Sequence, residues 1–122
     1  MMKIAVSLVL GLALALGSAQ AFRVLEVLER SYELRLTDVS LPRSDAEAIG
    51  YKPCTRCAYS YMHISGETTY HLGSRRVSLA ELTEEAARIK RTAGASDRTL
   101  VMLHYDPQTG IATRIRMESP KG

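Results

Sequence analysis

Two cysteines separated by two residues, Cys54 and Cys57, have the type and spacing in this chain that point most directly to chemistry. Pairs with this spacing act as thiol–disulfide redox centres, supply thiolates to a metal ion, or close a small structural disulfide. Covalent attachment of a c-type haem needs a histidine directly after the second cysteine, and the chain has Ala58 there. The pattern therefore excludes covalent haem and leaves three interpretations.

The residues around the pair favour the structural disulfide. A thioredoxin-like centre needs a helix that starts at the first cysteine, whereas the residues after Cys57 have the pattern of a strand. A metal site would need further ligands, and the candidates are His63, His71 and His104. Export, which the N-terminus indicates, brings the chain to an oxidising compartment where free thiolates are disfavoured. We therefore predict a disulfide between Cys54 and Cys57, with redox or metal-handling roles as alternatives.

The histidines give only weak support for a metal site. His63 and His71 are expected on the two arms of one hairpin, with their side chains on opposite faces of the sheet. Thioether and imidazole groups suit copper, and the chain offers a set of them in Met62, His71, Met102 and His104. Such residues are more often core methionines and hydrogen-bonded histidines. We therefore predict no metal and no cofactor, with copper as an alternative.

Motifs for hydrolysis or nucleotide binding do not occur in the sequence. There is no His-Glu-x-x-His zinc motif, no nucleophile elbow and no glycine-rich phosphate loop. Glu84 and Glu85 are expected on the solvated face of a helix, where paired carboxylates need no catalytic role. We therefore predict no catalytic residues and a protein that is not an enzyme.

Aromatic side chains are the remaining candidates for a binding surface. A stripe could be formed by Tyr51, Tyr59, Tyr61, Tyr70 and Tyr105. Cross-strand tyrosine pairs also stabilise small sheets without any ligand, and this is the favoured interpretation. The formal net charge is only +3, with Lys3 supplying one charge in the N-terminal segment, and the arginines are scattered. Nucleic-acid binding needs a concentrated basic face, so we expect no nucleic-acid partner.

The N-terminal segment, residues 1–21, has the three parts of a secretory signal peptide. A short basic stretch ends at Lys3, an uncharged apolar run extends to Gly17, and Ala19-Gln20-Ala21 has the pattern that signal peptidase cleaves. The alternative is an uncleaved membrane anchor. An anchor needs about 20 apolar residues, which is more than this run provides. We therefore predict cleavage before Phe22, a periplasmic location and no membrane span in the mature protein.

Residues 22–122 are expected to form a single small domain that positions these groups. Alternating or continuous apolar patterns predict strands at 31–37, 58–64, 68–72, 99–105 and 111–117. The pattern at 24–29 is compatible with a strand or a helix, and a strand is favoured because the run has two valines and continues into the next strand. The runs at 58–64 and 68–72 flank Gly66 and predict a hairpin. The polar residues 43–50 predict a loop, 99–105 a strand covered on both faces, and 111–117 an edge or half-wet strand with Ala112 pointing outward.

One helix is predicted to begin at Ser78. The sequence Ser78-Leu79-Ala80-Glu81 fits a capping box, in which the serine and glutamate side chains satisfy backbone N–H groups at the helix start. Apolar residues at helical spacing mark one face, and Gly94 is the expected stop. The chain is therefore predicted to be α+β, a mostly antiparallel sheet or small open β-barrel with one helix packed against it.

Residues 68–117 carry a resemblance to a known group of proteins. The pattern is Thr-x-Tyr, then Gly-x-x-Val-Ser-Leu-Ala-Glu-Leu, a strand ending Tyr-Asp-Pro-x-Thr-Gly, and Ala-Thr-Arg-Ile-x-Met-Glu. It is similar to small exported proteobacterial β-rich domains of unknown function, over about half of the mature chain. These motifs are caps and turns, so the resemblance implies a fold and no site residues.

Together these features favour a non-enzymatic periplasmic module that binds a protein or another envelope component, or assists a neighbouring system. The alternative is a thiol-redox or metal-handling protein that uses Cys54 and Cys57.

Overall fold

The computed structural model describes residues 29–44 and 47–118. The predicted signal peptide, and all of the predicted strand at 24–29 except Glu29, lie outside these ranges. The strands are β1 (Arg30–Arg35), β2 (Val39–Ser40), β3 (Ala48–Tyr51), β4 (Ser60–His63), β5 (Thr69–Leu72), β6 (Arg75–Val77), β7 (Leu100–Tyr105) and β8 (Ala112–Met117). The helix is α2 (Leu79–Lys90), and two 3₁₀ turns are η1 (Leu36–Asp38) and η2 (Ser96–Arg98).

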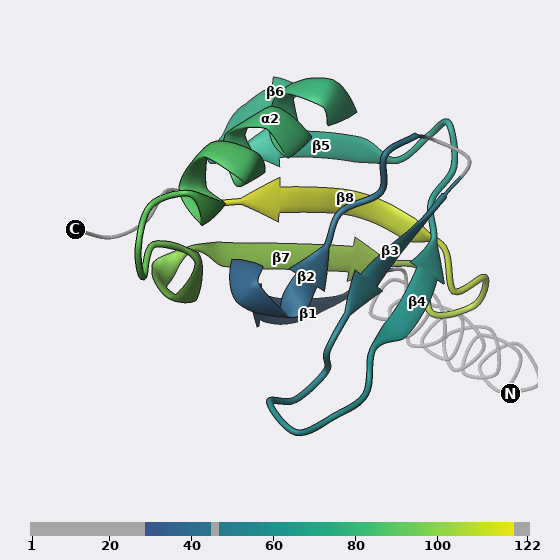
Figure 1. Ribbon diagram of the computed structural model, residues 1–122. Helices are drawn as coiled ribbons and strands as arrows, with labels where there is room; N and C mark the ends of the chain where they lie inside the picture. Colours follow the sequence, from purple (N-terminus) through teal and green to yellow (C-terminus); the bar gives the residue numbers. More distant parts are fainter. Residues whose placement is uncertain (1–28, 45–46, 119–122) are drawn as a thin grey trace, which may run out of the picture.

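The described residues form two open sheets and one α-helix, which confirms the predicted α+β class (Figure 1). The larger sheet has five strands in the order β1-β7-β8-β5-β6, and the smaller has three in the order β2-β3-β4. All neighbouring strands run antiparallel except β5 and β8, which are parallel. Neither sheet closes on itself, so the architecture is not a closed barrel.

The hydrophobic core lies on one face of the five-stranded sheet, which we call its inner face. Helix α2 and the smaller sheet lie on this side (Figure 1). Fully or almost fully buried side chains come from all three parts, namely Ile49, Leu82, Ala86, Ile89, Val101, Leu103, Ile115 and Met117. The opposite, outer face carries polar side chains such as Arg114 and His104.

Helix α2 begins as predicted. The Ser78 hydroxyl accepts a hydrogen bond from the Glu81 backbone N–H at 3.1 Å, which makes Ser78 the N-cap. Leu82, Ala86 and Ile89 are buried along one side of the helix. The helix ends at Lys90, and Gly94 follows in a turn with a φ of +74°.

The predicted hairpin around Gly66 is wrong. Strand β4 pairs with β3 in the smaller sheet, whereas β5 pairs with β8 and β6 in the larger one. The turn at Gly66 therefore carries the chain from one sheet to the other. The hairpin that does form joins β5 to β6, and its turn glycine is Gly73, with a φ of +60°.

The predicted loop at 43–50 is also wrong in its second half. Residues 48–51 form β3, the central strand of the smaller sheet, and Ile49 is fully buried. A single large apolar residue among polar and small neighbours gave no alternation long enough to predict a strand.

Strands β7 and β8 differ from expectation in their surroundings. On β7 only Val101 and Leu103 are buried, so one face is covered and not two. Strand β8 lies between β7 and β5 and is not an edge. The register shifts between His104 and Tyr105, which leaves one extra residue on β8 and turns Ala112 into the core.

Candidate functional site

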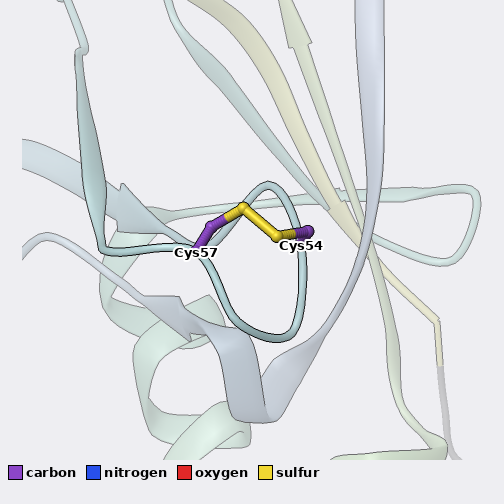
Figure 2. Close-up of a disulfide and its surroundings, with 2 residues drawn as sticks. All are labelled: Cys54 and Cys57. Atoms are coloured by element: carbon purple, nitrogen blue, oxygen red, sulfur yellow. A yellow bond between two sulfur atoms is a disulfide. The ribbon is translucent and has the colours of Figure 1, made fainter.

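The predicted disulfide between Cys54 and Cys57 is confirmed. The bond lies in the loop that joins β3 to β4, and Figure 2 shows it bridging the two sides of this narrow loop. The Cys57 backbone N–H donates to the Cys54 carbonyl at 3.1 Å, so the four residues form one tight turn. Both sulfurs are committed to the bond, and the Cys54 residue is exposed to solvent.

The disulfide lacks one feature that activates redox cysteines, a helix that begins at the first cysteine, although a cation, Arg56, lies between the two cysteines in the sequence. Such thiols gain a low pKa when a helix N-terminus or a nearby cation stabilises the thiolate. Here Cys57 is followed by an extended segment and then β4, as the sequence predicted, and no helix begins at Cys54. On the same loop, the ammonium group of Lys52 lies 5.2 Å from the ring centroid of Tyr59. The ammonium is therefore held over an aromatic face.

The five tyrosines of the predicted stripe do not form one surface. Tyr51 and Tyr70 are buried in the core. Tyr105 stacks against Tyr32 with ring centroids 5.3 Å apart, and a hydrogen bond with Tyr32 raises the pKa of Tyr105. Only Tyr59 and Tyr61 are exposed, at 42% and 72%, and they are the exposed large hydrophobic side chains of the described residues.

Tyr61 lies over a glycine of the neighbouring strand. It pairs with Gly50 across β3 and β4, on the solvent side of the smaller sheet. A Cβ atom added at Gly50 would lie 3.2 Å from the Tyr61 Cε1 atom and 3.3 Å from the Ser40 Cβ atom. The ring therefore lies close over the glycine, and a side chain at position 50 would need its neighbours to shift by a few tenths of an ångström. This pairing could not be predicted from the sequence, because it depends on β3, which was expected to be a loop.

We call Lys52, Tyr59, Tyr61 and the Cys54–Cys57 disulfide the tyrosine–disulfide face. These residues lie on β4 and on the loop that precedes it, and Figure 1 shows this loop extending away from both sheets. The face combines two exposed aromatic rings with a turn that a covalent bond closes. It is suited to contact with another molecule because the disulfide already restricts the turn before binding.

The candidate metal ligands are spread over two sheets. His63 is exposed on β4, whereas His71 and His104 lie on β5 and β7 of the larger sheet. Met62 is buried in the core of the smaller sheet, so it cannot join His71 and His104 in the copper set. Among residues 29–44 and 47–118 no group of three or more His, Cys, Asp or Glu side chains is arranged to hold a metal ion.

His71 and His104 share the outer face of the larger sheet with several arginines. Burial lowers the pKa of both histidines, and the charge of Arg114 lowers it further. Arg76 and Arg116 add to the effect on His71, and Glu29, with its carboxylate 3.3 Å from the His104 Nδ1 atom, opposes it on His104. The surroundings therefore favour neutral imidazoles, and they also repel a metal cation.

No protein-family model, curated protein or solved structure matches this chain. Within the described part of the chain, no helix is both long and apolar enough to cross a membrane.

Proposed function

We propose that the protein is an exported, non-enzymatic binding module of the periplasm that contacts a protein of the cell envelope through the tyrosine–disulfide face. The observation that carries this proposal is the exposure of Tyr59 and Tyr61 beside a disulfide-closed turn. Tyrosine is enriched where proteins meet, because it offers a large apolar ring and a hydroxyl at low entropic cost. A pre-closed loop lowers the cost of ordering that binding would otherwise carry.

Export is supported by two independent features. The N-terminal residues have the pattern of a cleavable signal peptide. The Cys54–Cys57 bond suits an oxidising compartment such as the periplasm, since disulfides are rare in the cytosol. The resemblance of residues 68–117 to small exported proteobacterial domains agrees with this location.

The thiol-redox alternative is favoured by one observation, the solvent exposure of Cys54. An accessible sulfur can be attacked by an external thiolate. The absence of a helix beginning at Cys54 argues against it, because the thiolate would have no helix dipole to lower its pKa.

A redox assay separates the two functions. The protein is purified from the periplasm, where intact mass should show an N-terminus at Phe22 and a chain that is two hydrogens lighter than its reduced form. Reduction of insulin by dithiothreitol is then followed with the wild type and with the double variant Cys54→Ser/Cys57→Ser. We expect the two proteins to give the same rate. Faster reduction with the wild type would assign the thiol-redox function instead.

The binding face is tested by photocrosslinking in intact cells. A photoreactive amino acid is placed at position 59 or 61, and at Ser74 as the control, which is exposed in the turn between β5 and β6. We expect one and the same crosslinked protein from positions 59 and 61 and none from position 74. Equal crosslinking from all three positions, or none from 59 and 61, would contradict the proposed face.

A further inference from the structure

We propose that the partner protein binds by β-strand addition, with an extended segment of its chain laid along the free edge of β4. Strand β4 forms one border of the smaller sheet, with β3 as its neighbouring strand (Figure 1). The main chain of β4 would supply hydrogen bonds, and the tyrosine–disulfide face the side-chain contacts. This inference rests on the proposed function and adds the conformation of the segment that the face receives.

The direction of the β4 main-chain groups follows from the pairings of β3. The Lys52 backbone N–H donates to the Asp38 carbonyl at 2.9 Å, so the main-chain groups of Lys52 point towards the β2 side. Because these directions alternate along a strand, those of Tyr51 point the other way, towards Ser60 on β4. The N–H and C=O of Tyr61, one residue further along, therefore point away from β3 to the free edge.

His63 agrees with this alternation. It lies two residues after Tyr61, so its main-chain groups should point to the same edge, and it forms an isolated parallel bridge with Ile111. Among residues 29–44 and 47–118, no strand pairs with this edge, and Ile111 is the one residue bridged to it. The edge at Tyr61 is therefore open in this part of the chain.

The other three sheet edges are protected, whereas β4 is not. Edge strands are commonly guarded against pairing by charged side chains, by proline or by being very short. Of the other edges, β1 carries charged residues such as Arg30 and Glu33, β6 has two arginines among its three residues, and β2 is two residues long. Strand β4 has the sequence Ser-Tyr-Met-His, without proline, glycine, or an Asp, Glu, Lys or Arg. It is thus the unguarded edge of the described sheets.

An extended peptide is the ligand that such an edge selects, because its main chain carries the complementary donors and acceptors. The two exposed tyrosines lie beside the edge. Tyr61 lies over Gly50, and the Lys52 ammonium, two residues further along the same segment, lies 5.2 Å from the ring centroid of Tyr59. Both rings are therefore on one side of the smaller sheet. They offer a surface to alternate side chains of the added segment, which point to one side at a period of two.

A second copy of this chain fits the edge less well. If two β4 edges paired antiparallel about Tyr61, residue 63 of one copy would lie opposite residue 59 of the other. The bridge to Ile111 already occupies that side of His63, so the turn between β7 and β8 of each copy would obstruct the other. A segment of a different protein carries no such turn and can leave the edge before His63.

The first test is amide hydrogen exchange in the free mature protein. The Ser60 and Met62 amides point towards β3 and should be protected, whereas the Tyr61 amide should exchange at close to the rate of an unstructured peptide. A Tyr61 amide as protected as its two neighbours would show that the edge is already covered, and would overturn the inference. If the protein were also dimeric, the edge would be assigned to a second copy.

The second test separates the backbone contact from the side chain. Proline removes a backbone N–H and is tolerated at an edge where that N–H faces solvent. Tyr61→Pro therefore removes the ring and the N–H, and the matched control Tyr61→Ala removes the ring alone. Each is combined with the photoreactive amino acid at position 59 in intact cells. We expect about tenfold less crosslinked product from Tyr61→Pro than from Tyr61→Ala, since one hydrogen bond to the partner is lost.

The amide spectra of the purified variants show that both are folded. Equal crosslinking by the two folded variants would overturn strand addition and leave the proposed function standing, because the face would then bind through its side chains alone. Absence of any crosslink from position 59 with Tyr61 intact would contradict the proposed function itself.

A third measurement needs no proline variant, so it tests the inference even if Tyr61→Pro does not fold. The crosslinked product formed from position 59 is purified with Tyr61 intact, and its hydrogen exchange is compared with that of the free protein. We expect the Tyr61 amide to exchange at least about tenfold more slowly in the product, as for an amide that gains a hydrogen bond. An unchanged rate would overturn the inference.

Discussion

The Cys54–Cys57 bond closes a very short loop, and this determines how it can act on stability. A disulfide stabilises chiefly by restricting the unfolded chain, and the effect grows with the length of the loop that it closes. The two cysteines are only three positions apart. The chain-entropy relation for a loop of about four residues gives about 2 kcal/mol. The bond also holds the turn that presents Tyr59, so its second effect is local order at the tyrosine–disulfide face.

Cys54→Ser is therefore expected to lower the free energy of unfolding by up to about 2 kcal/mol, because the unfolded chain regains the freedom of the open loop. Urea denaturation of the mature protein measures this change. Cys57→Ser and the double variant are the controls, and all three should lose the same amount. No change in any variant would show that the bond contributes nothing to stability.

At the scale of elements, local signals were reliable and pairings were not. The cap at Ser78 and the turn before β8 depend on residues close in sequence, and the structure has both. The prediction of a hairpin around Gly66 required β4 and β5 to pair with each other. In the structure β4 pairs with β3 and β5 pairs with β8, so the two strands are buried in different sheets. In the sequence, the strand–turn–strand pattern looks the same whether the two strands pair with each other or lie in different sheets. The parallel pairing of β5 with β8 joins residues far apart in sequence and left no local signal.

Gly73 and Gly66 both lie in turns between strands, but they should differ in how well they tolerate a side chain. Gly73 has a φ of +60°, which side chains adopt at a cost of about 1 to 2 kcal/mol. Gly66 is not among the glycines with positive φ, and a Cβ added there would meet nothing within 4 Å. Gly73→Ala should therefore destabilise the protein by about 1 kcal/mol or more, whereas Gly66→Ala should be neutral or stabilising by up to about 1 kcal/mol.

Thermal and urea denaturation of the two variants measure the effect, and each variant is the control for the other. If Gly66→Ala were the more damaging change, Gly66 and not Gly73 would be the conformationally demanding turn.

At the scale of the molecule, the tyrosine–disulfide face depends on contacts between separate segments, because Tyr61 on β4 pairs with Gly50 on β3. The sequence predicted the disulfide because its two ends are neighbours in the chain. It did not predict the contact of Tyr61 with Gly50, because that contact exists only when β3 and β4 are paired in register.

Two histidines on the outer face of the larger sheet should make the free energy of unfolding depend on pH. Burial first, and then Arg114, Arg76 and Arg116, lower the pKa of His71 below its ordinary value of 6.5. Burial and Arg114 also lower the pKa of His104, with Glu29 partly opposing them. In the unfolded chain both imidazoles take up a proton near pH 6.5. Between that value and the lowered pKa, the unfolded state therefore binds more protons than the folded state.

Stability rises with pH wherever the unfolded state holds more protons. The free energy of unfolding should therefore fall as the pH is lowered from 7 towards 5, since protonation of His71 and His104 places new charge beside the arginines. The double variant His71→Gln/His104→Gln should flatten this part of the profile, measured by urea denaturation at each pH. His63→Gln is the matched control, because His63 is exposed on β4 in the other sheet, and it should leave the slope as in the wild type. An unchanged slope in the double variant would show that other groups take up the protons, and that the two imidazoles on the outer face are not what couples folding to pH.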